Sequence, residues 1–457
     1  MRNIEGAGGI ILSSMDSTVQ RKKTYIEKLG LETVPKSLRT STTFDYIKIQ
    51  MAVSINAGNF LVPALAVLEG GLTFLQAVAV TVIGAWVAFF FVSLLALPGA
   101  VYGLPAQYAI RTILGMKGAM WLSSPVRTLT SLYWFSVQTI AGTYMVKEIF
   151  SRAFGLEISF IYISITLALI MAYLALVGFA AMKKLTSYFA PLLLISGGVM
   201  FYIYIFSGNT GGISWSEVMG QEGTGSIGTM LFFASLAFVQ YVSGVSSSSD
   251  LARYGKTPSA AFVGIYIGNG AGFLCTAILG AYTASAAGHW NPFLVTSQMT
   301  NSFVLLLIIS SAAIASMISI NINNAYTGGF SLLNSFPKLG RVKSALIFGA
   351  AGVLLSTYPG VVDEAEGFIS LLGVFVIPLS AVIVSDFWFI KKRKLSESDF
   401  TMLVDSRKPI NINAVYAIVG GIIVYTMIPS QYSPGFITFF LTIIAYYYIV
   451  KLSKVRV

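Results

Sequence analysis

Long apolar stretches, each able to cross a lipid bilayer as a helix, dominate this sequence. Charged residues make up only 10% of the chain, against about 25% in soluble domains, so they cannot cover a water-soluble particle of this size. We therefore expect an all-α polytopic membrane protein with twelve transmembrane helices. The predicted spans are residues 49–69, 73–97, 119–146, 158–180, 185–206, 226–248, 260–286, 301–326, 343–361, 366–390, 411–428 and 432–451.

Basic residues gather on one side of these spans. Of the 29 Lys and Arg residues, 26 lie in the N-terminal tail, in loops on the same side, or in the C-terminal tail. Because basic residues collect on the cytoplasmic side, we expect a multi-pass plasma-membrane protein with both termini in the cytoplasm. The net charge of +11 then reflects topology and anionic lipid, and not nucleic acid. We expect residues 1–44 to form a cytoplasmic tail and residues 45–452 to form one transmembrane domain.

Two predicted spans are interrupted by small and polar residues. Residues 54–59 in span one read Ser-Ile-Asn-Ala-Gly-Asn, and residues 243–250 in span six hold a glycine, a run of serines and an aspartate. Transporters often use such broken helices at the bilayer midplane to hold ions and substrates. The two breaks lie five spans apart, which predicts a 5+5 inverted-repeat core, here followed by two C-terminal helices.

Polar residues at membrane depth mark a candidate binding site. Trp134 and Gln138 are four residues apart, so they share one helix face. An indole that stacks and a carboxamide that pairs suit a flat heterocycle. Asparagines in span eight are costly in a membrane unless they are satisfied or reach water. The candidate substrate-binding residues are Asn59, Trp134, Gln138, Gln240, Tyr241, Asn321 and Asn324.

Several chemistries are excluded by what the spans lack. The chain has one cysteine, Cys275, and one histidine, His289, so neither a metal cluster of the usual kind nor an internal disulfide can form. No acidic or basic residue lies at the centre of a predicted span, which argues against a carboxylate proton relay and against a charged substrate. We expect no enzyme activity and a neutral or zwitterionic, polar, planar substrate.

Five short motifs occur in order along residues 45–450. They are residues 103–111 between spans two and three, Arg127 with Trp134 and Gln138 in span three, residues 243–255 at the end of span six, Asn324 with residues 334–338 at the end of span eight, and Pro378 with residues 386–388 in span ten. Together these motifs resemble those of the nucleobase–cation symporter-1 family, which includes cytosine, purine, uracil, allantoin and hydantoin transporters.

The resemblance implies a ten-helix core of the sodium/leucine-transporter type, with substrate held between spans one, three, six and eight. It implies that Trp134 stacks on the substrate, that Gln138 hydrogen-bonds it and that Tyr241 adds a second ring. The span-eight amide is then Asn324, or Asn321 if the helix register shifts.

A sodium site is implied in the same way. Its ligands are carbonyl groups of Ile55 and Gly58 in span one with groups from span eight, and the span-eight candidates are Ala315, Ser316 and Ser319. One expected hydroxyl is absent in either register, and the loss of one oxygen ligand weakens a hard-cation site. Sodium and proton coupling therefore both stay open.

The sequence thus predicts a secondary active transporter that imports a nucleobase or related planar heterocycle by alternating access. A sodium or proton gradient would drive it, and no cofactor is expected beyond the possible Na⁺. The alternative is a cation-coupled symporter of a small amino acid or other neutral polar solute on the same core fold.

Overall fold

The computed structural model describes residues 27 and 29–455, apart from residues 207–214, 364 and 404–408. Most of the predicted tail, residues 1–44, lies outside this part of the chain. The described residues are almost entirely helical, and their one β-type pairing is an isolated bridge between Ser41 and Gly255. The all-α class is confirmed.

A helix or a bent helix pair occupies each of the twelve predicted ranges. These helices are α2 (Thr43–Ser54) with α3 (Leu61–Leu68), α4 (Phe74–Leu94), α8 (Ser124–Phe154), α9 (Phe160–Val177), α10 (Phe179–Phe206), α12 (Ile227–Val242), α14 (Pro258–Ala287), α16 (Phe303–Ser335), α17 (Gly340–Ser356), α19 (Ala365–Ser385), α21 (Ile412–Met427) and α22 (Pro434–Val455).

Length and apolarity suffice for a membrane span in nine helices of the described chain, and in ten spans if the bent pair α2–α3 counts as one. The remaining two of the twelve predicted spans do not meet both criteria, for separate reasons. Helix α8 has 31 residues but carries many polar side chains, and α21 is apolar but has only 16 residues. Helices α8 and α16 also run eight or nine residues beyond their predicted ends at residues 146 and 326.

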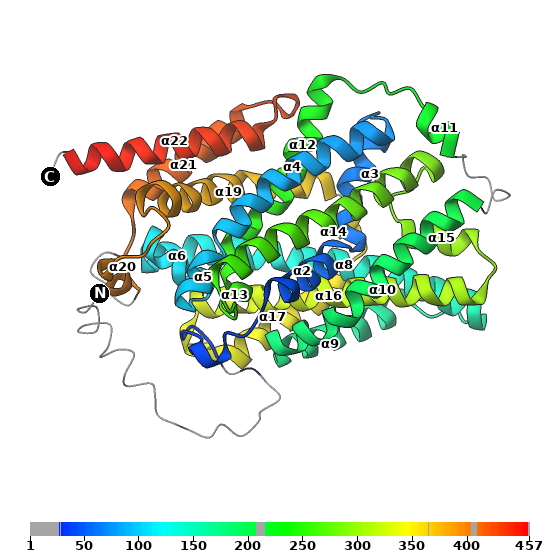
Figure 1. Ribbon diagram of the computed structural model, residues 1–457, viewed down its shortest axis with the longest axis horizontal. Helices are drawn as coiled ribbons and strands as arrows, with labels where there is room; N and C mark the ends of the chain where they lie inside the picture. The colour runs from blue at the N-terminus through cyan, green and yellow to red at the C-terminus, as the bar shows by residue number, and fades with distance from the viewer. Residues whose placement is uncertain (1–26, 28, 207–214, 364, 404–408, 456–457) are drawn as a thin grey trace.

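The long helices run side by side along the long axis of the molecule (Figure 1). Helix α20 (Glu397–Met402) and the last turns of α22 lie at one end, which we call the basic end because its loops carry most of the Lys and Arg residues. Helices α11 (Trp215–Gly220) and α15 (Pro292–Met299) lie at the opposite end.

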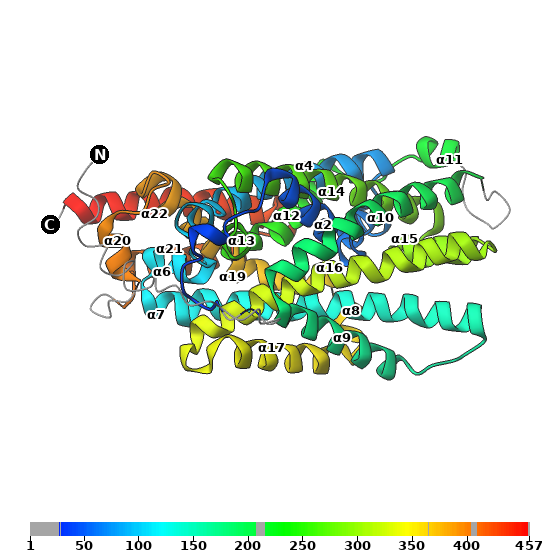
Figure 2. The same ribbon diagram turned by 60° about the horizontal axis from the view of Figure 1, so that its bottom comes forward.

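Two groups of helices form the core. Helices α2, α4, α12 and α14 pack on one another and are called the first group, and helices α8, α9, α16 and α17 form the second group. Figure 2 shows α4 and α14 on one side of the molecule and α9 and α17 on the other. Helix α10 contacts both α2 and α16, so it connects the two groups, while α19, α21 and α22 pack together beside α12.

Both predicted breaks are present. Helix α2 ends at Ser54 and the chain bends by 69° before it continues through η2 (Ala57–Phe60) into α3. Asn56 caps this restart, because its side-chain oxygen accepts a hydrogen bond from the Asn59 backbone N–H. Helix α12 passes instead into a short 3₁₀ turn, η4 (Ser243–Ser246), and then into α13 (Ser248–Ala252).

Candidate functional site

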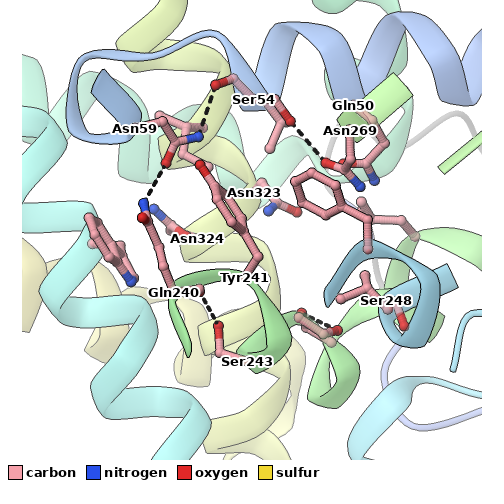
Figure 3. Close-up of a pocket in the computed structure, with 18 of the residues that line it drawn as sticks. Gln50, Ser54, Asn59, Gln240, Tyr241, Ser243, Ser248, Asn269, Asn323 and Asn324 are labelled. Carbon is pink, nitrogen blue, oxygen red and sulfur yellow. Dashed lines mark hydrogen bonds between the residues drawn. The ribbon is translucent and has the colours of Figure 1, made fainter. Parts of the chain in front are cut away.

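A cavity of about 120 Å³ lies where the two breaks face α8 and α16. It is smaller than the 300–1,000 Å³ pockets typical of drug-sized ligands, so it suits a molecule of roughly one ring. Figure 3 shows that its labelled polar residues come from several different helices. The lining residues are Gln50, Val53, Ser54, Asn59, Phe89, Val92, Arg127, Trp134, Gln138, Gln240, Tyr241, Ser243, Gly244, Ser247, Ser248, Leu251, Asn269, Ile320, Asn323 and Asn324.

The Gln138 side chain joins α8 to the break in span one. Its Oε1 accepts a hydrogen bond from the Gly58 backbone N–H at 3.0 Å, and its Nε2 donates to Asn56 Oδ1. A Cβ atom at position 58 would lie 2.4 Å from Gln138 Nε2, so only glycine leaves room for this approach. Both ends of the Gln138 amide are therefore occupied by backbone and side chain of the break.

Asn59 extends this hydrogen-bond network to span six. Its Nδ2 donates to the Ser54 carbonyl at 2.9 Å, and its Oδ1 accepts from Gln240 Nε2 at 3.0 Å (Figure 3). The freed carbonyl at the end of α2 is thus satisfied by a side chain, as a helix end in a membrane requires. The network also links the two breaks to each other through one amide pair.

Three aromatic rings, those of Phe89, Trp134 and Tyr241, border the cavity from different helices. Trp134 lies on α8 and is only partly buried. Tyr241 lies near the end of α12, where its ring packs against Phe89 and Phe273 with centroids 4.8 Å away in each case. These contacts hold the Tyr241 ring in place while one side of it borders the cavity.

Several polar atoms around the cavity are buried and have no hydrogen-bond partner among the described residues. Buried polar groups normally find a partner, so such atoms point to a polar ligand or ordered water. They include the acceptors Gln240 Oε1 and Asn323 Oδ1 and the donors Tyr241 Oη, Ser248 Oγ and Arg127 Nε. Residues that line the cavity therefore carry both acceptors and donors that lack a partner in the described chain.

Six of the seven predicted substrate-binding residues line the cavity, and Asn321 does not. The Asn321 amide donates to the Phe135 carbonyl and to Thr139 Oγ1, each at 3.0 Å, and so ties α16 to α8. Asn324 is the span-eight candidate that reaches the cavity, one turn further along α16.

The predicted cation ligands lie outside the cavity lining. In α16, Ser319 Oγ donates to the Ala315 carbonyl and Ser316 Oγ donates to the Ala313 carbonyl, both at 2.8 Å. Ile55 follows the last residue of α2, and Gly58 lies in η2 next to Gln138.

The predicted substrate-binding set omits several lining residues, among them Gln50, Asn269, Asn323 and Arg127. Arg127 is 6% exposed and donates to Thr327 Oγ1 at 3.0 Å. Its position seven residues before Trp134 places it two helical turns away on the same face of α8, and this spacing was the available signal. Among the described residues that line the cavity there is no acidic side chain, and Arg127 is their one cationic side chain.

Most of this chain matches known proteins in sequence. Residues 33–450 match the family described as permease for cytosine/purines, uracil, thiamine and allantoin. The allantoin permease of Bacillus subtilis (strain 168) is 22% identical over 421 residues, which cover 83% of this chain and 82% of that protein. The hydantoin permease of Microbacterium maritypicum is 23% identical over 317 residues, which cover 65% of this chain and 63% of that protein.

Solved structures share the fold. A nucleobase-cation-symport-1 family transporter, in a closed conformation with bromovinylhydantoin bound, superposes with a TM-score of 0.79 at 18% identity, covering 94% of this chain and 97% of that one. A Na⁺-coupled sialic acid symporter in an outward-open state superposes with a TM-score of 0.60 at 14% identity, covering 94% and 93% of the two chains.

Proposed function

The chain belongs to the family of permeases for cytosine and purines, uracil, thiamine and allantoin, and from this premise we propose which residues of the cavity bind the substrate. The protein is a multi-pass membrane transporter and not an enzyme, and its substrates are of the nucleobase type. Such a transporter exposes its site alternately to the two sides of the membrane by rocking one helix group against the other.

The unpartnered atoms of the cavity define the complementary chemistry of the substrate. Gln240 Oε1 and Asn323 Oδ1 accept hydrogen bonds, so they suit ring N–H groups, and the Tyr241 hydroxyl suits a ring carbonyl. Rings with adjacent N–H and C=O groups, such as those of uracil, hydantoin and allantoin, present this combination. This set of unpartnered atoms beside Trp134 is the observation that carries the proposal.

We propose that Trp134 and Tyr241 stack on the ring of the substrate. The amide side chains of Asn59, Gln240 and Asn324 would form hydrogen bonds with the polar edge of that ring. Gln138 has a double role in this proposal, because its amide is already bonded to Gly58 and Asn56. The substrate would compete with the span-one break for this amide, so that binding and the geometry of the break are linked.

A binding panel tests this assignment. The purified protein is heated with uracil, cytosine, xanthine, hydantoin, allantoin, leucine or glycine, with and without sodium, and its melting temperature is measured. We expect at least one heterocycle, and neither amino acid, to raise the melting temperature and then to be accumulated by proteoliposomes. Stabilisation by an amino acid alone would support the alternative symporter instead.

We further propose Na⁺ as the coupling ion, held by carbonyls of Ile55, Gly58 and Ala315 and by the hydroxyl of Ser319, with Ser316 as the alternative hydroxyl. The fold shared with a Na⁺-coupled symporter supports this. Proton coupling is the second candidate, because Asp250 Oδ2 is buried in α13 without a partner among the described residues. We place the basic end in the cytoplasm of a plasma-membrane protein, as the distribution of Lys and Arg indicates.

A further inference from the structure

The residues that precede α2 lie across the basic end and are bonded to the chain at Gly103 and to the α13–α14 loop. Val34 is fully buried, and its N–H donates to the Gly103 carbonyl at 3.0 Å. The Ser41 N–H donates to the Tyr254 carbonyl at 2.9 Å, next to the isolated bridge with Gly255. This segment, residues 29–41, is therefore a fixed part of the fold at this end.

The carboxylate of Glu27, just before this segment, is the acceptor at the centre of a buried pocket. Its Oε1 accepts from Arg253 Nη2 at 2.8 Å, from the Tyr254 hydroxyl at 2.7 Å and from the Tyr326 hydroxyl at 2.9 Å. Its Oε2 accepts from the Phe179 N–H at 2.9 Å. These donors come from the α13–α14 loop, from α16 and from the start of α10, so one side chain joins three separate elements.

The backbone around Glu27 is shaped to admit a carboxylate. Gly178 has a φ of +88°, and a Cβ atom there would lie 2.0 Å from Glu27 Oε2. A side chain at this position would therefore be strained and would also fill the space of the carboxylate. The Glu27 N–H donates to the Leu176 carbonyl at 3.2 Å, which holds the residue against the junction of α9 and α10.

The pocket is positively charged even with Glu27 in place. The guanidinium groups of Arg253 and Arg341 lie 4.6 and 4.4 Å from the centroid of the Phe330 ring. Arg253 has no exposed surface, and all three nitrogens of Arg341 are buried without a hydrogen-bond partner in the described chain. Since buried charges require compensation, loss of the Glu27 charge would leave Arg253 without its ion-pair partner, next to a second buried guanidinium group.

The Glu27 pocket lies directly beyond the end of the cavity. Leu251 lines the cavity, and Arg253 follows it by two residues. Asn323 also lines the cavity, and Tyr326 is three residues further along α16, about one helical turn. On both sides of the cavity, the next turn toward the basic end thus carries a donor to the same carboxylate.

We propose that Glu27 is a latch that holds the cavity closed at the basic end. Its carboxylate ties the α13–α14 loop, which belongs to the first helix group, to α16 of the second group. The two groups have to separate at this end for the cavity to open there, so Glu27 has to leave its pocket in each transport cycle. The latch thereby shifts the population toward the state closed at this end. This inference rests on the proposed transport by alternating access.

Thiol labelling tests the latch. Cys275 is first replaced by serine, and Ser248→Cys then places a reporter thiol in the cavity near the basic end. Right-side-out and inside-out vesicles are treated separately with a membrane-impermeant maleimide, so that the labelling shows from which side of the membrane the thiol is accessible. Glu27→Gln keeps the shape but removes the charge, and we expect labelling from the basic end to become about tenfold faster, the effect of losing one charge-assisted hydrogen bond.

Glu32→Gln is the matched control, because the Glu32 carboxylate bonds the Gly30 N–H within its own segment at 2.6 Å. Its labelling rate should equal that of the parent. Equal labelling rates in Glu27→Gln and the parent, with or without a lower melting temperature, would overturn the latch and leave Glu27 a structural residue.

Tyr326→Phe keeps the test decisive if Glu27→Gln does not fold. It removes one neutral donor from the pocket, and we expect labelling about threefold faster; an unchanged rate would contradict the proposal. The labelling rate measures the opening of the cavity at the basic end, and this measurement requires no substrate. A failure of the heterocycle panel, with the labelling difference intact, would therefore reject the proposed substrate class and not the latch.

Discussion

The two helix breaks are rich in small polar residues, yet the structure uses them differently. In span one, the side chains of Asn56 and Asn59 and the N–H of Gly58 are bonded to the chain itself or to Gln138. In span six, Ser243, Ser246 and Ser247 bond backbone carbonyls of their own turn. The residues that flank this second break leave four atoms without partners in the described part of the chain: Gln240 Oε1, Tyr241 Oη, Ser248 Oγ and Asp250 Oδ2.

This difference separates a braced break from an open one. The break in span one bends by 69°. Amide side chains of the protein bond backbone groups that the bend frees, so these groups need no ligand. The break in span six presents polar atoms that require a ligand, water or a proton, as buried groups without partners do. We infer that the first break mainly sets the geometry of the site and that the second mainly contacts the substrate. Substitutions at each break test this difference in role.

The largest effect is expected for Gln138→Leu, which removes the brace of span one. The Gly58 N–H would lose its partner, at a cost of about 1–3 kcal/mol, and Asn56 Oδ1 would keep only the hydrogen bond from the Asn59 N–H. We expect a markedly lower melting temperature and an altered ranking of the heterocycles. Gln240→Leu is the control from the other break and should destabilise less, because it removes only the hydrogen bond from Gln240 Nε2 to Asn59 Oδ1, and Gln240 Oε1 has no partner to lose among the described residues. Equal destabilisation by the two variants would remove the distinction between the breaks.

Trp134→Ala should come next, with an effect on binding and little on stability. The loss of stacking on a ring costs roughly 1–3 kcal/mol, so affinity should fall about tenfold or more. Trp134→Phe retains an aromatic surface and should keep most of the affinity. Calorimetric titration of the folded variants measures both, and unchanged binding by Trp134→Ala would place the substrate elsewhere.

Tyr241→Phe tests whether the break in span six contacts the substrate directly. The Tyr241 hydroxyl is buried and has no partner among the residues that the structure describes, so its removal should leave the melting temperature of the empty protein unchanged or slightly higher. Substrate affinity should fall by about three- to tenfold, the value of one hydrogen bond. Tyr133→Phe is a matched control, because the Tyr133 hydroxyl also has no partner within the described chain but Tyr133 does not line the cavity. An equal change in affinity for both variants would contradict a direct role of Tyr241.

The smallest effect is expected at the proposed sodium site. Substrate affinity should rise with sodium at constant ionic strength, because binding of the two ligands is reciprocally linked. Ser319→Ala should blunt that rise by a few-fold and leave sodium-free affinity nearly unchanged, and Ser316→Ala tests the alternative hydroxyl. If sodium has no effect and an imposed pH gradient drives uptake, coupling runs on protons, and Asp250→Asn becomes the variant to measure.

Local composition was enough to predict the membrane-spanning class, the helix ranges and the position of both breaks. A span needs only sufficient length and apolarity, and a break needs only small or polar residues inside such a run. The pairing of Trp134 and Gln138 on one face also follows from helix geometry, because residues four apart are neighbours. The membership in a permease family confirms the transport function predicted from the motifs.

The partners of those residues were decided by tertiary structure. Asn321, Asn323 and Asn324 differ by one to three positions, yet Asn321 bonds α8 while the other two line the cavity. Each residue turns the side chain by about 100° around the helix, so the rotation of α16 against its neighbours selects the residues that face the site. Gln138 reaches Gly58, and Glu27 reaches Arg253, across separations of 80 and 226 residues. Helix length and apolarity are local properties of the chain, whereas such contacts depend on how distant helices pack, and only the folded molecule contains that information.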